Sequence, residues 1–228
     1  MDLHKTDPEF MERFEYFAFD EVVNEKGQQL PESTRYMAIL ASLIGCGGLD
    51  AYKEILPKAL ENNITPIVVK EIVYQAACYL GYGKTLPFLN VTNEIFLQKG
   101  IKLPLSGQAT TTFDNRLEKG VEAQAEIFGQ QMKEAWKTSH INFWLGANCF
   151  GDYYTRKGLN LAEREMITFC FLMAQGGCEP QLIAHCKGNM NMGNDKEFLI
   201  KVVSQSLPYI GYPRSLNAIT CINKAAEE

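Results

Sequence analysis

Three residues that could carry acid–base or thiol chemistry lie close together in the sequence: Glu165, Cys178 and His185. A carboxylate hydrogen-bonded to an imidazole fixes its tautomer and raises its basicity, as a general acid/base requires. A thiol at the start of a helix is favoured as a nucleophilic thiolate by the helix dipole, although the neighbouring Glu179 opposes that effect. These residue types therefore predict proton transfer or thiol chemistry.

The segment around these residues predicts a helical hairpin. We expect a helix over Leu161–Gln175, a turn at Gly176-Gly177 and a second helix that starts around Glu179-Pro180. At 1.5 Å per residue, Glu165 would lie ~16 Å before the turn and His185 ~12 Å after it. In an antiparallel hairpin the two side chains would be nearly level and could share a hydrogen bond. A purely structural His–Glu pair is the alternative.

Cys178 occupies a different level of the second helix. It precedes His185 by about two turns, ~10 Å along the axis, so direct proton transfer between them is excluded. Gln181 stands midway and cannot serve as a redox thiol. Cys178 is thus either a reactive thiol or a small residue packed near a turn.

The rest of the chain predicts an all-α protein. Thr65-Pro66 has the residue types of a helix start, and the helix it opens would run to Gly81. Further helices are expected over Thr85–Gln98 and, with many charges, over Arg116–Lys137. The Pro-, Gly- and Thr-rich residues 100–114 predict a linker between a first unit, residues 1–99, and a second, residues 115–228.

The two units resemble each other, which predicts an internal duplication. YQAACYLGYGKTLPFLNVTN (74–93) aligns with SQSLPYIGYPRSLNAITCIN (204–223) at one constant offset. The identical pairs are Gln75/Gln205, Tyr79/Tyr209, Gly81/Gly211, Tyr82/Tyr212, Leu86/Leu216 and Asn93/Asn223. Upstream, Arg35 aligns with Arg164 when one residue of slippage is allowed.

The two copies differ where chemistry could occur. Glu165, Cys178 and His185 of the second copy align with Tyr36, Leu49 and Ile55 or Leu56 of the first. Since buried polar side chains are costly without partners, their retention in one copy favours one working site and one structural copy. Tolerated variation is the alternative.

Composition excludes several classes of protein. The 228 residues carry 22 basic and 27 acidic side chains with no basic run, which argues against nucleic-acid binding. The longest apolar runs, Met37–Gly45 and Met166–Ala174, are too short for a bilayer, and the polar N-terminus has no export signal. Seven cysteines without a C-x-x-C pair, and scattered histidines, predict neither a disulfide scaffold nor a metal site. We expect a cytoplasmic protein that binds no membrane and no metal.

One long stretch, GLNLAEREMITFCFLMAQGGCEPQLIAHCKGNMNMGNDKEFLIKVVSQSLPYIGYPRSLNAI (158–219), resembles the carboxymuconolactone decarboxylase family. The first copy, with TRYMAILASLIG (34–45), resembles the first half of tandem members. The resemblance implies an AhpD-like helical fold with two tandem repeats and no cofactor. It also implies a homo-oligomer, a trimer with pseudo-hexameric symmetry.

The family includes two kinds of chemistry. Its decarboxylases are lyases that act on a carboxylated lactone, whereas its AhpD-like branch reduces peroxides with a glutamate, a C-x-x-C pair and a histidine. The matching positions here are Glu165, Cys178, Gln181 and His185, so the second cysteine is absent. Cys186 would lie ~12 Å from Cys178 along one helix, too far for the ~4–7 Å that a disulfide requires between Cα atoms.

Three hypotheses follow for a small-molecule substrate. In a lyase, His185 would be the general acid/base and Glu165 its orienting partner. Arg156 could then clamp a substrate carboxylate, unless it is an exposed loop arginine, and Tyr209 is a further polar candidate, although Tyr79 shares its place in the other copy. The second hypothesis is a one-cysteine thiol peroxidase that uses Cys178 and an external thiol. The third is a non-catalytic protein that binds a small acid.

Overall fold

Helices joined by short turns make up most of the chain, as the sequence predicts. The structure is a computed structural model that describes residues 2–227. It is 78% helical, and no strand occurs among the described residues. None of the helices in this range combines the length and the apolar character that a membrane span requires.

The first half of the chain contains an N-terminal group of short helices followed by four long ones. Their bounds are α1 (Leu3–Thr6), α2 (Pro8–Tyr16), the π-helix η1 (Phe17–Glu21), α3 (Val22–Asn24), α4 (Glu32–Cys46), α5 (Leu49–Glu61), α6 (Pro66–Leu80) and α7 (Tyr82–Gln98). The predicted start of α6 is confirmed, because the Thr65 side chain accepts a hydrogen bond from the Val68 backbone N–H.

The second half repeats this order. Its elements are α8 (Arg116–Phe128), the 3-10 helix η2 (Gln130–Thr138), α9 (His140–Trp144), the π-helix η3 (Leu145–Tyr154), α10 (Leu161–Gln175), α11 (Glu179–Asn191), α12 (Lys196–Ile210) and α13 (Tyr212–Glu227). The four long helices α4–α7 have 15, 13, 15 and 17 residues, and α10–α13 have 15, 13, 15 and 16.

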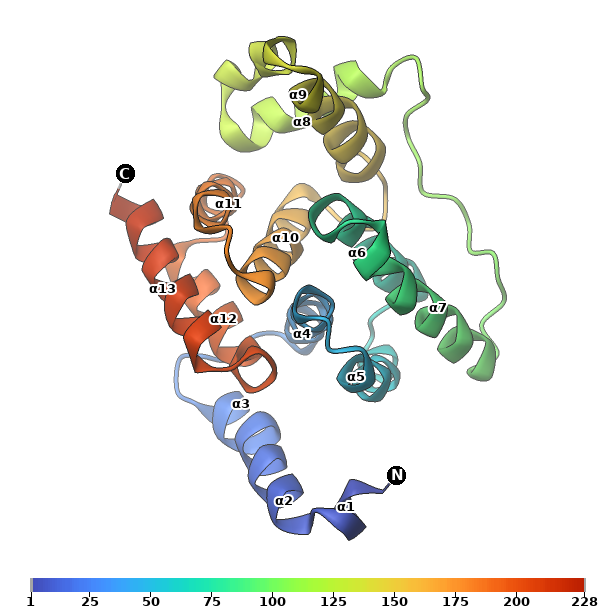
Figure 1. Cartoon of the computed structure of the whole chain (residues 1–228), viewed down its shortest axis with the longest axis vertical. Helices are drawn as coiled ribbons and strands as arrows, with labels where there is room; N and C mark the ends of the chain where they lie inside the picture. The colour runs from blue at the N-terminus through green and yellow to red at the C-terminus, as the bar shows by residue number, and fades with distance from the viewer. Residues whose placement is uncertain (1, 228) are drawn as a thin grey trace.

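The core is built around α4 and α10, which lie side by side at the centre of the molecule (Figure 1). Both helices are apolar on nearly all sides and are buried along most of their length, as their predicted apolar runs require. A Cβ atom on Gly45 would lie 2.8 Å from the carbonyl oxygen of Phe171, so the two helices approach closely at this point.

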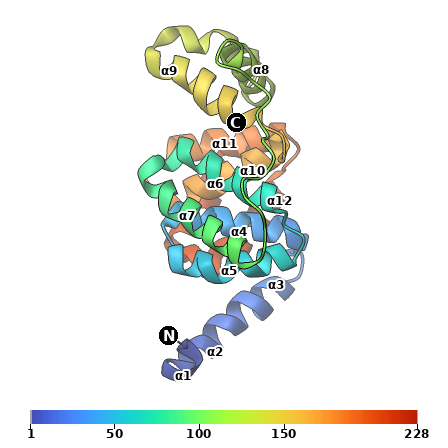
Figure 2. The same cartoon turned by 90° about the vertical axis from the view of Figure 1, so that its right-hand side faces the viewer.

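Two groups of short helices project from opposite ends of the long-helix block. Helices α1–α3 extend from one end, and α8 with η2, α9 and η3 covers the other (Figure 2). Residues 101–115, which contain no helix, run along the outside from α7 to α8 (Figure 1). The Thr110 hydroxyl donates to the carbonyl of Thr155 (2.7 Å), which attaches this segment to the end of η3.

The prediction of one helix over Arg116–Lys137 is wrong. Helix α8 ends at Phe128, because Gly129 adopts a φ of 102°, which is outside the helical region, and a separate 3-10 helix follows.

Glycines bring α8 and η3 into direct backbone contact. A Cβ atom on Gly120 would lie 1.9 Å from the carbonyl oxygen of Gly146, and one on Gly151 would lie 2.1 Å from that of Arg116. No larger side chain fits at either position. This contact holds the π-helix η3, and with it Cys149 and Tyr154, at a fixed place beside α6.

Two arginine–glutamine hydrogen bonds connect the halves. Arg35 of α4 donates through Nε to Gln205 of α12 (3.0 Å), and Arg164 of α10 donates through Nη1 to Gln75 of α6 (2.8 Å). All four side chains are buried. One bond runs from the first half to the second and the other from the second half to the first, so each half completes a polar contact inside the other.

Candidate active site

The site is positioned by the predicted hairpin of α10 and α11. Helix α10 starts at Leu161 behind a capping box, in which Asn160 accepts from the backbone of Glu163 and Glu163 accepts from that of Asn160 (2.9 Å each). It ends at Gly176, and α11 begins at Glu179. The predicted helix bounds are therefore confirmed.

The hairpin brings Glu165 and His185 into contact, as the helical spacing predicts. His185 Nδ1 lies 2.8 Å from Glu165 Oε2, and the Glu165 carboxyl is fully buried whereas 11% of the His185 side chain is exposed. When the carboxylate accepts this bond, Nδ1 carries the proton, which leaves Nε2 with its lone pair. The pair is built as a general acid/base and its orienting partner.

Two tyrosines extend this pair into a network. The Tyr154 hydroxyl donates to Glu165 Oε1 (2.8 Å) and also lies 2.8 Å from the Thr168 hydroxyl. The Tyr79 hydroxyl, from α6 in the other half, lies 2.8 Å from that of Tyr154. Burial, and then the charge of Glu165, raise the pKa of Tyr154, and burial raises that of Tyr79. Both phenols therefore remain protonated donors at neutral pH.

A side-chain amide also holds the backbones of Glu165 and His185 together. The Asn189 amide donates to the carbonyl oxygens of Glu165 (2.9 Å) and His185 (2.8 Å), and so ties α10 to α11 at this level. Gly188 provides the space for the carboxylate, because a Cβ atom there would lie 2.5 Å from Glu165 Oε2.

His185 forms part of the wall of a cavity of about 630 Å³ between α6, α8, η3, α10 and α11. Its ring is flanked edge-on by the rings of Tyr79 (5.4 Å) and Phe128 (5.3 Å). The other lining residues are mostly apolar or uncharged. They are Cys78, Gln124, Gln131, Met132, Leu145, Cys149, Phe150, Leu172, Gln175, Cys178, Gln181, Ala184, Lys187 and Asn191. Such a cavity, apolar with a few convergent polar groups, suits a small organic molecule.

Two of the predicted site residues, Gln181 and Cys178, line this cavity together with His185. Cys178 caps the start of α11 and is half-buried, with its thiol 3.5 Å from the carbonyl oxygen of Leu172. Burial raises the pKa of the Cys178 thiol, and the charge of Glu179 adds to the increase. The expected thiolate-stabilising effect of the helix start is therefore outweighed.

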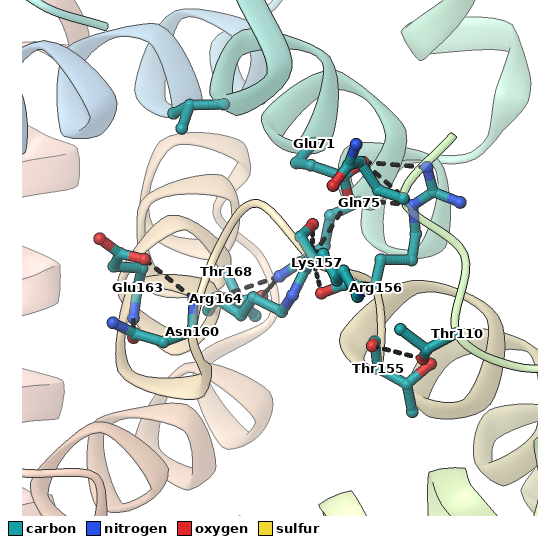
Figure 3. Close-up of polar contacts among 12 residues, drawn as sticks. Glu71, Gln75, Thr110, Thr155, Arg156, Lys157, Asn160, Glu163, Arg164 and Thr168 are labelled. Atoms are coloured by element: carbon teal, nitrogen blue, oxygen red, sulfur yellow. Dashed lines mark hydrogen bonds and ion pairs between the residues drawn. The ribbon is translucent and has the colours of Figure 1, made fainter. Parts of the chain in front are cut away.

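Arg156 lies outside this cavity. Its guanidinium makes three hydrogen bonds of 2.9–3.1 Å to the carboxylate of the buried Glu71, and the same carboxylate binds Arg164 (3.1 Å), as Figure 3 shows. Only 17% of the Arg156 side chain is exposed, so the alternative of an exposed loop arginine is wrong. A substrate-clamping role remains a prediction, and it would require the guanidinium to leave Glu71.

Tyr209 is also remote from His185. It lies on α12 and packs edge-on against Phe14 of the N-terminal helices, with ring centroids 6.0 Å apart. Its hydroxyl is buried with no hydrogen-bond partner, and burial raises its pKa to about 12. The structure thus places Tyr209 outside the cavity that His185 lines and beside the N-terminal helices, so its position does not support the predicted role in substrate binding at this cavity.

Sequence reasoning missed Tyr154, Lys187 and Tyr79 as members of the site. Tyr154 belongs to a π-helix, and no local periodicity connects it with Glu165. Lys187 follows His185 by two residues, and its position in a cavity wall depends on the packing of α8 and η2. For Tyr79, the duplication offered a signal, since the first copy lacks Glu165 and His185 but keeps a tyrosine at the position that aligns with Tyr209 of the second copy.

Comparison with known families finds a match over part of the chain. Residues 144–224 match the model of the carboxymuconolactone decarboxylase family. The match includes α10 and α11 with Glu165, Cys178 and His185, and it leaves the first half of the chain outside. No curated protein matches the chain.

Proposed function

We propose that this protein, whose residues 144–224 match the carboxymuconolactone decarboxylase family, is a lyase that removes a carboxyl group from a small ring compound. The observation that supports this most directly is the His185–Glu165 pair at the wall of a mostly apolar cavity. The arrangement requires no metal for proton transfer, and the cavity is large enough for a substituted ring.

The chemistry assigned to His185 is proton transfer. Loss of CO₂ leaves the electron pair of the broken C–C bond on the substrate as a carbanion or dienolate, which must then take up one proton. His185 Nε2 would deliver that proton or remove one in a preceding step, while Glu165 stabilises the imidazolium through Nδ1. Lys187 places a positive charge at the same cavity, which favours an anionic substrate.

The test is turnover of a panel of carboxylated lactones and related ring acids, followed by release of CO₂. His185→Gln keeps a polar side chain but removes the titrating group, and we expect kcat/KM to fall by about 10²–10⁴-fold. Tyr209→Phe is the matched control and should retain activity, because Tyr209 lies at the other end of the molecule. Full activity in His185→Gln would refute the lyase proposal.

Glu165 is a positioning residue in this scheme, since it acts through His185. Glu165→Gln keeps the shape of the side chain and an oxygen acceptor but removes the charge that stabilises the imidazolium. We expect a lower kcat with little change in KM, because the walls of the cavity remain in place. A kcat loss accompanied by an equal loss in every stability measurement would indicate a structural role only.

A thiol enzyme that uses Cys178 is the second candidate, because Cys178 lines the same cavity as His185. Since the pKa of this thiol is raised, we expect its alkylation to accelerate only at pH values above those of an ordinary free thiol. Peptide-resolved mass spectrometry across a pH series measures this directly. Rapid alkylation of Cys178 at neutral pH would favour the thiol enzyme over the lyase.

We also infer that the chain is a tandem duplication. The matching lengths of α4–α7 and α10–α13 support it, as do the reciprocal Arg35–Gln205 and Arg164–Gln75 hydrogen bonds. A homotrimer, which would imitate a hexamer of single repeats, is the assembly that the family resemblance implies, and light scattering of the purified protein tests it.

A further inference from the structure

A second pair of thiols faces the His185 cavity at a place that the family motif does not include. Cys78 lies near the end of α6 in the first half, and Cys149 lies in the π-helix η3 of the second. Both line the cavity, and Cys78 packs against the buried cluster that includes Cys149. The proximity of Cys149, and then burial, raise the pKa of the Cys78 thiol. The two thiols are therefore neighbours although they are far apart in the sequence.

This pair is connected to the His185–Glu165 pair by a continuous chain of hydrogen bonds. The Cys149 thiol lies 3.8 Å from the Tyr79 hydroxyl, to which it donates. The bonds from Tyr79 to Tyr154 and from Tyr154 to Glu165 are 2.8 Å each. Along this chain of hydrogen bonds, a proton can be passed in one direction, from the Cys149 thiol through Tyr79 and Tyr154 to the Glu165 carboxylate that binds His185.

The remaining cysteines provide a contrast within the same molecule. Cys186 and Cys221 are close enough for the charge of one to raise the pKa of the other. They are 0% and 2% exposed and do not line the cavity. Cys178 lines the cavity, but its thiol contacts a backbone carbonyl and Gln175. Cavity access, a thiol neighbour and the hydrogen-bond chain thus coincide at Cys78 and Cys149.

We propose that Cys78 and Cys149 are a redox-active dithiol, which forms a reversible disulfide when a small hydroperoxide enters the cavity. This proposal does not rest on the lyase function, because disulfide formation requires no turnover of a ring acid. It differs from a peroxidase centred on Cys178, since the second thiol is supplied by the same chain.

The steps balance with the hydroperoxide as the oxidant. Cys149 transfers its proton to the tyrosine chain, and its thiolate attacks the terminal peroxide oxygen. The O–O bond breaks, the alkoxide takes up a proton and leaves as an alcohol, and Cys149 becomes a sulfenic acid. The Cys78 thiol, whose pKa is raised, then attacks this sulfur and passes its proton to the departing hydroxyl group as the S–O bond breaks, so water leaves and no free Cys78 thiolate has to form first. In sum, two thiols and one hydroperoxide give one disulfide, one alcohol and one water.

Disulfide mapping of the intact protein tests the proposal. The reduced protein is treated with a limiting amount of tert-butyl hydroperoxide and digested without reductant, and linked peptides are identified by mass spectrometry. We expect a Cys78–Cys149 link that disappears after treatment with dithiothreitol. Cys78 and Cys149 that remain thiols while Cys178 is oxidised would overturn the proposal, as would a link confined to Cys186 and Cys221.

A matched pair of tyrosine variants tests the hydrogen-bond chain. Tyr79→Phe removes the hydroxyl that accepts from Cys149, and we expect the Cys78–Cys149 disulfide to form at least tenfold more slowly. Tyr209→Phe, the same change at the aligned position, should leave the rate unchanged. Equal rates in both variants would show that Tyr79 does not relay the proton. Disulfide mapping of the unsubstituted protein needs no variant, so it tests the proposal even if a tyrosine variant does not fold.

Discussion

The two ends of the molecule are built alike and differ in polar content. At one end, α8 and η3 cover Glu165 and His185, with Tyr79 reaching in from the other half. At the other end, the N-terminal helices cover Tyr36 and Tyr209, and Ile55 or Leu56 takes the aligned place of His185. The Tyr79 hydroxyl joins a hydrogen-bond network at the first end, whereas the Tyr209 hydroxyl at the other end has no hydrogen-bond partner among residues 2–227.

The difference shows that packing and chemistry are separable in this fold. The arginines Arg35 and Arg164 both bind a glutamine of the opposite half, so this structural contact is present at both ends. The carboxylate and the imidazole are present at one end only. A half that keeps the arginine–glutamine contact can therefore lose its acid–base residues without losing its place in the core.

The largest expected difference between the two ends is in the loss of stability when each arginine is replaced by alanine. Arg164 is fully buried and binds the buried Glu71, whereas the ion-pair partner of Arg35 is the exposed Glu32, 3.6 Å away. We expect Arg164→Ala to lower the free energy of unfolding by about 3–5 kcal/mol, because it opens a cavity and leaves the buried Gln75 oxygen and the carbonyl of Arg156 without this donor. Arg35→Ala should cost about 1–3 kcal/mol. Urea denaturation measures both, and equal losses would contradict the distinction.

A glycine substitution tests how tightly the surroundings of the Glu165–His185 pair are packed. Gly188→Ala would place a Cβ atom 2.5 Å from Glu165 Oε2 and 2.8 Å from the Phe128 ring. We expect a loss of about 1–3 kcal/mol in the free energy of unfolding, together with a broken Glu165–His185 hydrogen bond. The control is Gly83→Ala on α7, where no atom lies within 4 Å.

The control should be neutral or stabilising by up to about 1 kcal/mol, since alanine favours the helix. The His185 ring resonances in an NMR spectrum report the hydrogen bond directly. Unchanged His185 signals in Gly188→Ala would show that the carboxylate has space to move, contrary to the structure.

The smallest expected changes in the free energy of unfolding come from replacing the two aligned tyrosines, Tyr79 and Tyr209, and the two changes have opposite signs. Tyr209→Phe removes a buried hydroxyl that has no partner, so we expect a gain of about 1 kcal/mol in the free energy of unfolding. Tyr79→Phe removes a hydrogen bond to Tyr154 and should cost about 1 kcal/mol. Thermal melts of the two variants beside the parent give the comparison. A loss of stability in Tyr209→Phe would mean that its hydroxyl is satisfied after all.

The parts of the fold that could be predicted from sequence are those set by local rules. Helix α10, its turn and the start of α11 follow from caps, glycines and apolar spacing. The Glu165–His185 contact follows from the helical rise alone, because both residues belong to one hairpin. The end of α8 at Phe128 was missed, since an isolated glycine in a charged helical pattern is often tolerated.

The parts that could not be predicted depend on contacts between distant segments. Arg156 binds Glu71 because the loop before α10 packs on α6, and nothing near Arg156 in the sequence indicates that carboxylate. Tyr79 packs against His185, and Cys78 reaches the same cavity, for a similar reason, since both belong to the other half. The π-helical form of η3, which places Cys149 and Tyr154, depends on glycine contacts with α8 that no periodicity reveals.

Because Tyr79 reaches Tyr154 across the boundary between the halves, the site belongs to the whole chain and to neither half alone. A half that carries no acid–base pair of its own is thereby protected from deletion, since its loss would remove one wall of the cavity. The proposed activity would be inherited only when both halves are passed on together. Substitutions in α6 would then be selected for their effect on residues encoded far downstream.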